Sequence, residues 1–411
     1  MTHAELQNFV EDLAVRLDAP TVLEDAEQRM IAYSTHSEPI DDIRRDSILR
    51  KETKPDTKAW FRQFGIVQAT EPVRTPGDPG TGVLGRLCVP VRYLSRLMGF
   101  LWLIDDEVKL GAPEISIVQD VAGHVGLMLY EEELTRHLTG EVVTQLLSTS
   151  AELRELSVRQ IAESAKLDVH APCAVVVLRP LGLPDHEIRP TVTETLTEVT
   201  RRCQTIRHLH AATDDHGVLL VQLRTLEDES PAYHLAEEAR DCLLRRHRRS
   251  PGCRVIASVG EPQEHLIAAA SSYQQARLSA QVAQHVPTIG DLPRWRDLGV
   301  FRVLSQLPAD IAAAVLDPRL ATVLRSGDEP VVLTLETYLD LGCDAKATAE
   351  RLHLHRGTLY YRLQKAERIG GVDLRDGADR LSVHVGLKLA RYLGLLTTTP
   401  PPAPEHSVPR S

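Results

Sequence analysis

The chain has 411 residues, of which 43% are hydrophobic and 25% are charged, and its formal net charge is −10 at pH 7. This composition is typical of a globular protein, and the length predicts two to four domains. It excludes a membrane-spanning chain, because no segment approaches the roughly eighteen unbroken apolar residues that a spanning helix needs. The first residues are acidic rather than a basic targeting segment, so we expect a cytoplasmic protein.

The first unit is expected over residues 1–130. An opening helix carries one apolar stripe and ends at Pro20, and strands are predicted at 21–23, 29–34, 86–91 and 98–104. A closing helix at 113–129 completes an α+β pattern. The opening stripe comprises Leu6, Phe9, Val10, Leu13 and Leu17, and the closing helix carries Ile117, Val121, Val125 and Leu129 on one face.

The stretch between the two pairs of strands, residues 38–79, carries Trp60, Phe61, Arg62 and Phe64 among many polar residues. Two interpretations remain open. The stretch either forms a lid over a bound small molecule or packs as an ordinary loop and helix against a second copy of the chain. We expect Trp102 and Tyr93 in the core or in an interface rather than in contact with a ligand.

Residues 131–150 continue the closing helix as a connecting segment. Apolar residues recur along it at intervals of three, four and seven, which would let two copies pair along a seam. The alternative is a helix that lies on its own domain. The seam residues are Leu127, Leu134, Leu138, Val142 and Leu146.

Residues 151–287 alternate between helical and strand patterns, which predicts an α/β domain. A hairpin is expected around the turn that contains Asp214 and Asp215. These carboxylates favour a capped turn over a phosphoryl-transfer site, because no glycine-rich turn accompanies them to hold a phosphate. No catalytic residue, cofactor or metal ligand is therefore assigned, and we expect that the protein is not an enzyme.

The cysteines and the paired histidines give no metal site. The cysteines are widely spaced and form no C-x-x-C pair, so they predict buried free thiols. They are Cys88, Cys173, Cys203, Cys242, Cys253 and Cys343. The H-x-H pairs at 208–210 and 353–355 lack neighbouring ligands that could complete a coordination shell.

Two further segments flank the C-terminal domain. Residues 288–330 form a connector with an amphipathic stripe, Leu298, Phe301, Leu304 and Leu307, that predicts packing against neighbouring elements. Residues 396–411 are rich in proline and cannot bury a core, which predicts a disordered tail.

Residues 331–395 carry a helix-turn-helix pattern. After a first helix near 333–341, Asp344 can cap a short helix with small residues on one side. A turn at 353–355 leads into a helix over 356–369, in which Leu359, Leu363 and Ala366 lie on one face. Helix, short turn and helix is the order of a DNA-binding motif.

The second helix of this motif is basic on an acidic protein. It carries Arg356, Arg362, Lys365 and Arg368 against one acid, Glu367, so its local charge is about +3. Attraction between charges is screened within roughly 8 Å at physiological salt. The local charge of the helix therefore matters more than the net charge, and a basic helix on an acidic protein can still bind duplex DNA. The alternative is an ordinary surface helix with solvated charges. The residues predicted to contact DNA are His355, Arg356, Gly357, Thr358, Tyr360, Tyr361, Arg362, Gln364 and Lys365.

At these residues the chain resembles the PucR/CdaR-type bacterial transcriptional regulators, whose C-terminal motif is similar to that of Fis. The matching residues are His355, Arg356, Thr358, Leu359, Tyr361, Arg362, Leu363, Gly371, Asp373, Leu374, Asp379 and Arg380. The resemblance implies that His355 and Arg356 approach bases, and that Thr358, Tyr361 and Arg362 contact phosphates. Gly357 departs from the polar residue that the family often has there, which leaves one base contact open.

The other units resemble further parts of the same family. The segments APTVLEDAEQRMIAYS, RLCVPVRY and MGFLWLIDD are similar to a GAF-like N-terminal sensor, and residues 151–287 resemble a GGDEF-like domain with DDHG in the acidic turn. The implied fold class is a multidomain α+β and α/β chain: a GAF-like sensor, a degenerate GGDEF-like middle domain and an all-α helix-turn-helix domain.

Together these features predict a one-component transcriptional regulator that responds to a small-molecule effector. Its partners would be double-stranded DNA, the unidentified effector and a second copy of the chain in a homodimer or higher homo-oligomer, and the family suggests an activator. The alternative is a signalling or nucleotide-binding protein that acts through the middle domain.

Overall fold

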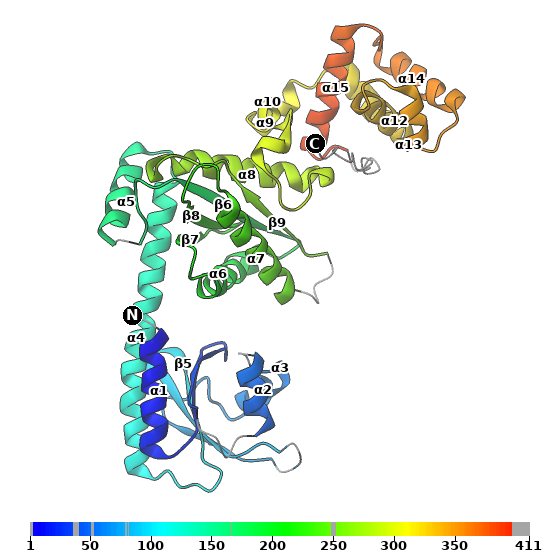
Figure 1. Ribbon diagram of the computed structural model, residues 1–411. Coiled ribbons are helices and arrows are strands. Elements are labelled where there is room, and N and C mark those ends of the chain that lie inside the picture. The colour runs from blue at the N-terminus through cyan, green and yellow to red at the C-terminus, as the bar shows by residue number, and fades with distance from the viewer. Residues whose placement is uncertain are drawn as a thin grey trace, which may run out of the picture. The chain divides into compact units, whose positions relative to one another are not determined.

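The computed structural model describes residues 3–35, 41–50, 53–78, 80, 82–164, 166–247 and 252–396. The chain forms two compact units, Met1–Leu138 and Thr139–Ser411. Helix α4, Ala112–Leu146, runs without interruption from the first unit into the second (Figure 1). The predicted disordered tail lies almost wholly outside the described residues. Within those residues, no helix is long and apolar enough to cross a membrane.

The first unit is built on an antiparallel sheet in the order β2-β1-β5-β4-β3. Its register places Trp102 of β5 between Val22 of β1 and Cys88 of β4. The strands are β1 (Thr21–Asp25), β2 (Met30–Tyr33), β3 (Val73–Thr75), β4 (Arg86–Tyr93) and β5 (Arg96–Ile104). The predicted strands at 21–23, 29–34, 86–91 and 98–104 are present, and β3 is an additional edge strand.

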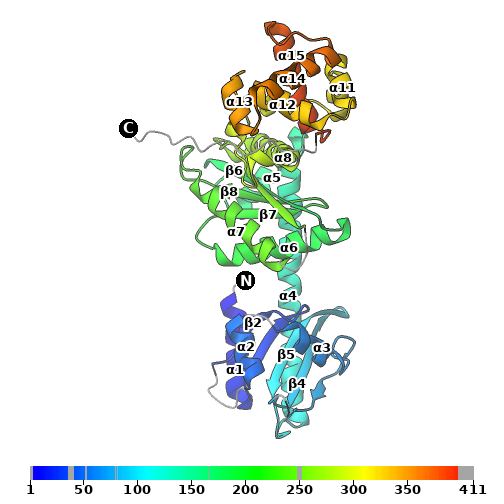
Figure 2. The same cartoon turned by 90° about the vertical axis from the view of Figure 1, so that its right-hand side faces the viewer.

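Side chains alternate between the two faces of this sheet, as the period of a β-strand requires. Leu101 and Leu103 pack into a cluster with α1 (His3–Leu17) and α4, whereas Phe100 and Trp102 pack on the opposite face. That second face is covered by α2 (Asp42–Arg50) and α3 (Pro55–Arg62), seen beside β4 and β5 in Figure 2. The sheet therefore separates an apolar core from a second, more polar space.

The buried faces of the two flanking helices differ in part from the prediction. Phe9 is 37% exposed and lies outside the core, because the other stripe residues of α1 already face the sheet. On α4, Val118 and Ala122 are buried beside Val125 and Leu129, while Ile117 and Val121 are only half-buried. The inward face of α4 is thus rotated by about one residue from the predicted one.

The seam predicted along α4 divides at the boundary between the units. Leu134 and Leu138 are 44% and 51% exposed, and Leu127 is also exposed. Leu146, in contrast, is fully buried in a core cluster of the second unit. The correction concerns Leu146, which packs in its own domain and cannot also belong to a free seam.

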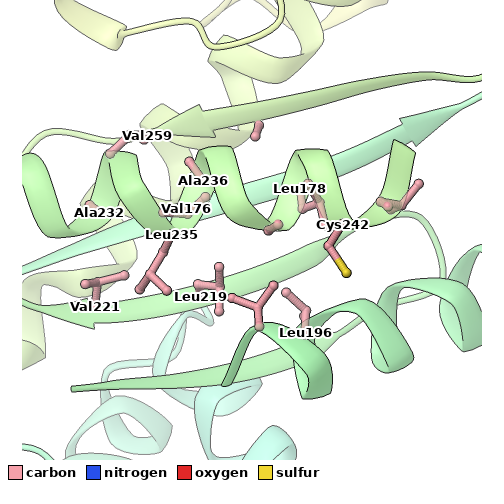
Figure 3. Close-up of a cluster of buried hydrophobic side chains, with 14 of the residues drawn as sticks. Val176, Leu178, Leu196, Leu219, Val221, Ala232, Leu235, Ala236, Cys242 and Val259 are labelled. Carbon is pink, nitrogen blue, oxygen red and sulfur yellow. The ribbon is translucent and has the colours of Figure 1, made fainter. Parts of the chain in front are cut away.

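The second unit contains a four-stranded antiparallel sheet in the order β7-β8-β6-β9. The strands are β6 (Cys173–Leu181), β7 (His208–Ala212), β8 (Gly217–Gln222) and β9 (Arg254–Val259). Helices α6 (Asp185–Arg202) and α7 (Ser230–Arg246) cover one face (Figure 3). Val176 and Leu178 point to these helices, and Val175 and Val177 point to the other face. The predicted alternation of helices and strands is present, but all strand pairs of the sheet are antiparallel, so the domain is α+β rather than α/β.

The other face of this sheet carries α5 (Ala151–Ser164), η1 (Leu266–Ala268) and α8 (Ala269–His285). Helix α8 approaches the end of β9 so closely that a Cβ atom on Gly260 would lie 1.9 Å from the carbonyl oxygen of Ser272. Only glycine fits at this position. The connector follows, with η2 (Pro287–Ile289), η3 (Trp295–Leu298), α9 (Phe301–Leu304) and α10 (Ala309–Ala314).

The connector is packed, as its apolar stripe predicts. Leu298, Phe301 and Leu304 are buried in a cluster with Val282 of α8 and Leu389 of the last helix. The final domain comprises α11 (Pro318–Arg325), α12 (Glu329–Asp340), α13 (Ala345–Arg351), α14 (Arg356–Gly370) and α15 (Gly377–Tyr392). Helix α11, which we expected within the connector, contributes Leu320 and Val323 to the core of this domain.

A buried ion pair joins α12 to α15 within this domain. Arg391 Nε donates to Glu336 Oε1 at 2.8 Å, and Arg391 Nη2 donates to Glu336 Oε2 at 2.5 Å. Both side chains are almost completely buried. Two parallel hydrogen bonds between a guanidinium and a carboxylate fix both the distance and the orientation of the helices.

We predict that Glu336→Gln lowers the free energy of unfolding by about 3–5 kcal/mol, because it leaves the buried Arg391 guanidinium without its counter-charge. The double variant Glu336→Leu/Arg391→Met should be less damaging than the sum of its single changes, since it leaves no unpaired charge. Urea unfolding followed by circular dichroism measures both. Equal stability of Glu336→Gln and the wild type would contradict this account.

Candidate DNA-binding surface and ligand cavity

Helix α14 has a defined cap at each end. His355 precedes it, and its Nδ1 accepts a hydrogen bond from the backbone N–H of Gly357 at 3.2 Å. At the other end Gly371 has φ +65°, and the N–H groups of Gly371 and Val372 both donate to the carbonyl of Glu367. A left-handed glycine of this kind ends a helix. The caps confine α14 to Arg356–Gly370, close to the predicted helix over 356–369.

The short helix α13 packs against α14 in the predicted arrangement. Asp344 caps α13 by accepting from the N–H groups of Lys346 and Ala347, at 2.8 and 3.0 Å. Thr348 and Ala349 are buried, as expected for small residues at a close helix contact. The turn that follows contains His353 with φ +51°. Helix α13, this turn and α14 form the helix-turn-helix.

The buried stripe of α14, Leu359, Leu363 and Ala366, determines which residues face outward. Seven of the nine predicted contact residues are exposed, with Tyr360 at 46% and Tyr361 at 58%. The seven are His355, Arg356, Gly357, Thr358, Tyr360, Tyr361 and Gln364. We call them the recognition surface. It combines a guanidinium, an amide, hydroxyl groups and open backbone on little more than two turns of helix.

The other two predicted residues are half-buried and make contacts within the domain. Arg362 Nη1 donates to Thr334 Oγ1 at 3.2 Å, and Lys365 Nζ forms an ion pair with Asp328 Oδ2 at 2.6 Å. Asp328 is the N-cap of α12, and Thr334 lies in the middle of that helix. The domain therefore draws the Arg362 and Lys365 side chains toward α12, and Arg356 provides the exposed positive charge of the recognition surface.

One exposed cation beside this surface was not predicted as a contact residue. Arg380 of α15 lies with its Nη1 atom 3.9 Å from the Cys343 sulfur. Burial raises the pKa of the nearby Tyr338. Tyr360 raises this pKa further, and the positive charge of Arg380 lowers it. Arg380 and Tyr360 thus flank the same side chain. Periodicity could not reveal this, because Arg380 comes from the helix after the motif.

In the first unit, a small cavity of about 10 Å³, enough for about one water molecule, lies between the sheet and α2 and α3. It is lined by Val22, Glu24, Met30, Arg44, Ser47, Thr53, Phe61, Arg86 and Trp102. Of the aromatic residues in the predicted lid, Phe61 lines the cavity. The ring of Trp60 lies edge-on to that of Phe61, with the centroids 4.9 Å apart. Phe64 in turn lies edge-on to Trp60, at 5.0 Å. Trp102, which we expected to be structural, also forms part of the wall.

The charged groups of the cavity are deeply buried. Glu24 accepts hydrogen bonds from Thr53 Oγ1 at 2.7 Å and from Trp102 Nε1 at 2.9 Å. Burial nevertheless raises the pKa of Glu24 to about 7, and burial together with the charge of Arg86 lowers the pKa of Arg44 to about 9. Arg86 is held by Asp41 and lies 5.1 Å from the Phe61 ring centroid.

The hairpin turn of the middle domain holds its acidic residues in local contacts. Asp214 lies 3.3 Å from Arg189, and Asp215 lies 2.7 Å from His216 Nδ1. The H-x-H pair on β7 is also occupied, because His208 and His210 both lie 3.0 Å from the hydroxyl of Thr200. All six cysteines are free thiols, four of them buried. The two acids and the two histidines therefore each have a structural partner.

Comparisons with known proteins extend over both domains of the second unit. Residues 331–389 match the PucR C-terminal helix-turn-helix domain, and residues 150–282 match a GGDEF-like domain. The match to the first begins inside α12, two residues after its start, and ends in α15. The comparisons thus support a GGDEF-like middle region and a C-terminal helix-turn-helix in this chain.

Three proteins of Bacillus subtilis (strain 168) are similar to this chain. The proline-responsive transcriptional activator PutR is 22% identical over 410 residues, which cover 94% of this chain and 97% of that protein. The DNA-binding transcriptional activator AdeR is 20% identical over 411 residues, which cover 95% and 94%. The purine catabolism regulatory protein is 35% identical over 66 residues, which cover 16% and 12%. Domain order and relatives agree, and together they support a PucR-type transcriptional regulator.

Proposed function

We propose that the chain is a one-component regulator in which α14 binds double-stranded DNA and a small molecule bound by the first unit changes that binding. The recognition surface is the observation that carries this proposal. It presents Arg356 and Gln364, whose side chains can read base edges, beside hydroxyl groups that can hold phosphates. An ordinary solvated helix face would not place two exposed tyrosines beside them.

The contacts inside the domain assign different tasks to the basic residues. Arg356 is exposed and can enter the major groove directly. Arg362 and Lys365 reach DNA only by exchanging Thr334 and Asp328 for phosphate oxygens, so their share of the binding energy is the difference between two sets of contacts. Sequence preference is therefore assigned to His355 and Arg356, and general affinity to Thr358, Tyr361, Arg362 and Lys365.

A single helix-turn-helix buries little surface, and two joined motifs gain affinity and specificity from their effective concentration. We therefore propose a homodimer. Leu127, Leu134 and Leu138 supply exposed apolar side chains along α4 at heptad-related intervals. The position of these residues on the helix that links the two units supports α4 as the dimer contact.

The first unit is proposed as the sensor, with a GAF-like fold. The order of its elements supports this proposal: an opening helix, two strands, a middle stretch with α2 and α3, further strands and a closing helix. The name of PutR describes an activator that responds to proline, and that of AdeR describes an activator. From these names we carry over only the classes, effector response and activation. The alternative, a signalling role for the middle domain, is less favoured because Asp214 is paired with Arg189 of α6 and Asp215 with His216.

We predict that Arg356→Ala lowers affinity for a specific site by about 1–3 kcal/mol and relaxes preference at one base pair. Arg368→Ala removes the same charge from the exposed far end of the same helix and should change affinity little. The measurement is retention of fragmented genomic DNA by full-length protein, with the retained fragments sequenced. Equal losses for the two variants would mean that α14 acts only through its net charge.

We predict that Gly357→Ala separates folding from DNA binding. An added Cβ would meet only the His355 ring, at 3.5 Å, and the backbone there is helical, so stability should be unchanged or raised by up to about 1 kcal/mol. DNA affinity should fall, because Gly357 is proposed to let the backbone lie close to the duplex. Thermal unfolding and DNA retention test the two effects, and undiminished DNA affinity would remove Gly357 from the contact set.

We predict that Leu134→Glu/Leu138→Glu shifts the protein toward a monomer, because the change places carboxylates in the proposed α4 contact. Leu156→Glu alters a leucine on α5 that is 47% exposed and serves as the control. Light scattering coupled to size-exclusion chromatography gives the mass of each variant. A wild-type monomer, or a dimer that survives the double change, would place the dimer contact elsewhere or exclude it.

A further inference from the structure

One arginine outside the helix-turn-helix lies beside it without a carboxylate partner. Arg380 is near the start of α15 and is exposed. Within the described part of the chain it forms no ion pair, and its side chain contacts the Cys343 sulfur, which lies 3.9 Å from Nη1. A thiol is only a weak hydrogen-bond acceptor. The charge of Arg380 is therefore available to a stronger acceptor.

The carboxylates next to Arg380 and Cys343 in the sequence have other partners. Asp379 forms an ion pair with Arg319 of α11 at 2.7 Å. Asp344 accepts from two backbone N–H groups at the start of α13, which it caps. Neither carboxylate forms an ion pair with Arg380, so the positive charge is left at the surface of the domain.

Arg380 lies at the part of the domain where a helix-turn-helix meets the DNA backbone. Cys343, its contact, directly precedes Asp344, the N-cap of α13. In this motif the first helix crosses the DNA backbone while the second enters the major groove. The N–H of Cys343 also donates to the carbonyl of Tyr338 at 2.8 Å. The pKa of Tyr338, raised by burial, is raised further by Tyr360 of α14 and lowered by Arg380, so Arg380 lies near both helices of the motif.

The cations on the other side of α14 lie at the opposite end of α12. Lys365 pairs with Asp328, the N-cap of α12. Arg380 lies near Tyr338, ten residues further along the same helix. At a rise of about 1.5 Å per residue, these two positions are about 15 Å apart. The major groove of B-DNA is about 12 Å wide, so cations at this separation can meet phosphates on both sides of a groove that holds α14.

We propose that Arg380 of α15 binds a phosphate of the DNA backbone, so that α14 has phosphate contacts on both of its sides. A guanidinium and a phosphate form charge-assisted hydrogen bonds. Arg362 and Lys365 must give up partners inside the domain to form such bonds, whereas Arg380 gives up only a thiol contact. The inference deepens the proposed function and rests on it, because it adds a contact from a helix outside the motif.

The test is the salt dependence of DNA binding by the full-length protein, measured by fluorescence anisotropy. The probes are a labelled random-sequence duplex and a labelled genomic fragment that the wild type retains. Loss of one phosphate contact should lower the slope of log affinity against log salt by about 0.9 per chain. Arg380→Met should show this loss and should weaken both probes by the same factor, since a phosphate contact carries no sequence information. Arg380→Lys keeps a positive charge and should keep the slope.

Arg375→Met is the matched control. The Arg375 side chain is 91% exposed, and the next residue toward the N-terminus, Leu374, donates its N–H to Glu367 near the C-terminal end of α14. Arg375 therefore lies at the end of α14 away from the motif turn, and its loss should leave the slope unchanged. Thermal unfolding is measured for every variant. Arg380→Met should unfold at the wild-type temperature, because it removes only one weak contact.

Cys343 gives a second readout that requires no change at Arg380. Cys343 and Cys253 are the two cysteines that are not buried. A DNA strand bound at Arg380 would cover the Cys343 sulfur, so saturating duplex should slow alkylation of Cys343 by iodoacetamide. Cys253 belongs to the middle domain and should react equally fast with and without DNA. Mass spectrometry of the digested protein gives both rates.

Any of three results would overturn the inference: Arg380→Met keeps the wild-type slope, Arg375→Met lowers the slope as much as Arg380→Met, or DNA leaves the alkylation of Cys343 unchanged. If the wild type still retains genomic fragments selectively, such a result leaves the proposed regulator function standing. Absence of selective retention by the wild type would instead reject the proposed function itself.

Discussion

The recognition surface depends on the apolar stripe formed by Leu359, Leu363 and Ala366. A helix of this length is not stable alone in water, so α14 exists because that stripe is buried against α11, α12 and α13. Burial of one face fixes the rotation of the helix, and the rotation decides which polar residues reach outward. The Glu336–Arg391 pair then holds α15 on α12, the helix against which α14 packs most extensively. The side chains proposed to read DNA are thus oriented by residues that are buried in the domain.

Buried cations are paired differently around α14 and beside the cavity of the first unit. Around α14, each half-buried cation has found a partner: Arg362 has Thr334, and Lys365 has Asp328. Arg44 has none among the described residues, although it is more deeply buried than either. The charges around α14 are thus paired within the C-terminal domain, whereas in the first unit a cavity of about the size of one water molecule lies beside the Arg44 guanidinium.

Sequence patterns predicted the order of helices and strands in each domain, because the apolar periodicities of α14, of the β4–β5 pair and of the connector are long and regular. They gave nine candidate contact residues, but not which of these are exposed and which have partners inside the domain. Arg362 and Lys365 differ from Arg356 through contacts with α12, more than twenty residues away along the chain, and no local pattern records such contacts. The cavity was beyond sequence reasoning for the same reason: Glu24, Arg44, Arg86 and Trp102 come from four separate elements. Leu146 shows a third limit, since a heptad spacing cannot tell a seam between two chains from the core of one.

Helix α4 offers a physical route by which the two functions can be linked. Its first half packs on the sheet that forms the cavity floor, through Val118, Ala122 and Val125, and its last turn is buried in the core of the second unit through Val143 and Leu146. A helix anchored in both cores transmits a shift or rotation of one end to the other. Thermodynamic linkage then requires reciprocity: if an effector changes DNA affinity by some factor, DNA changes effector affinity by the same factor. For couplings of the usual size, about 1–3 kcal/mol, this corresponds to roughly 5- to 150-fold. An effector would need only that much preference for one arrangement of α4.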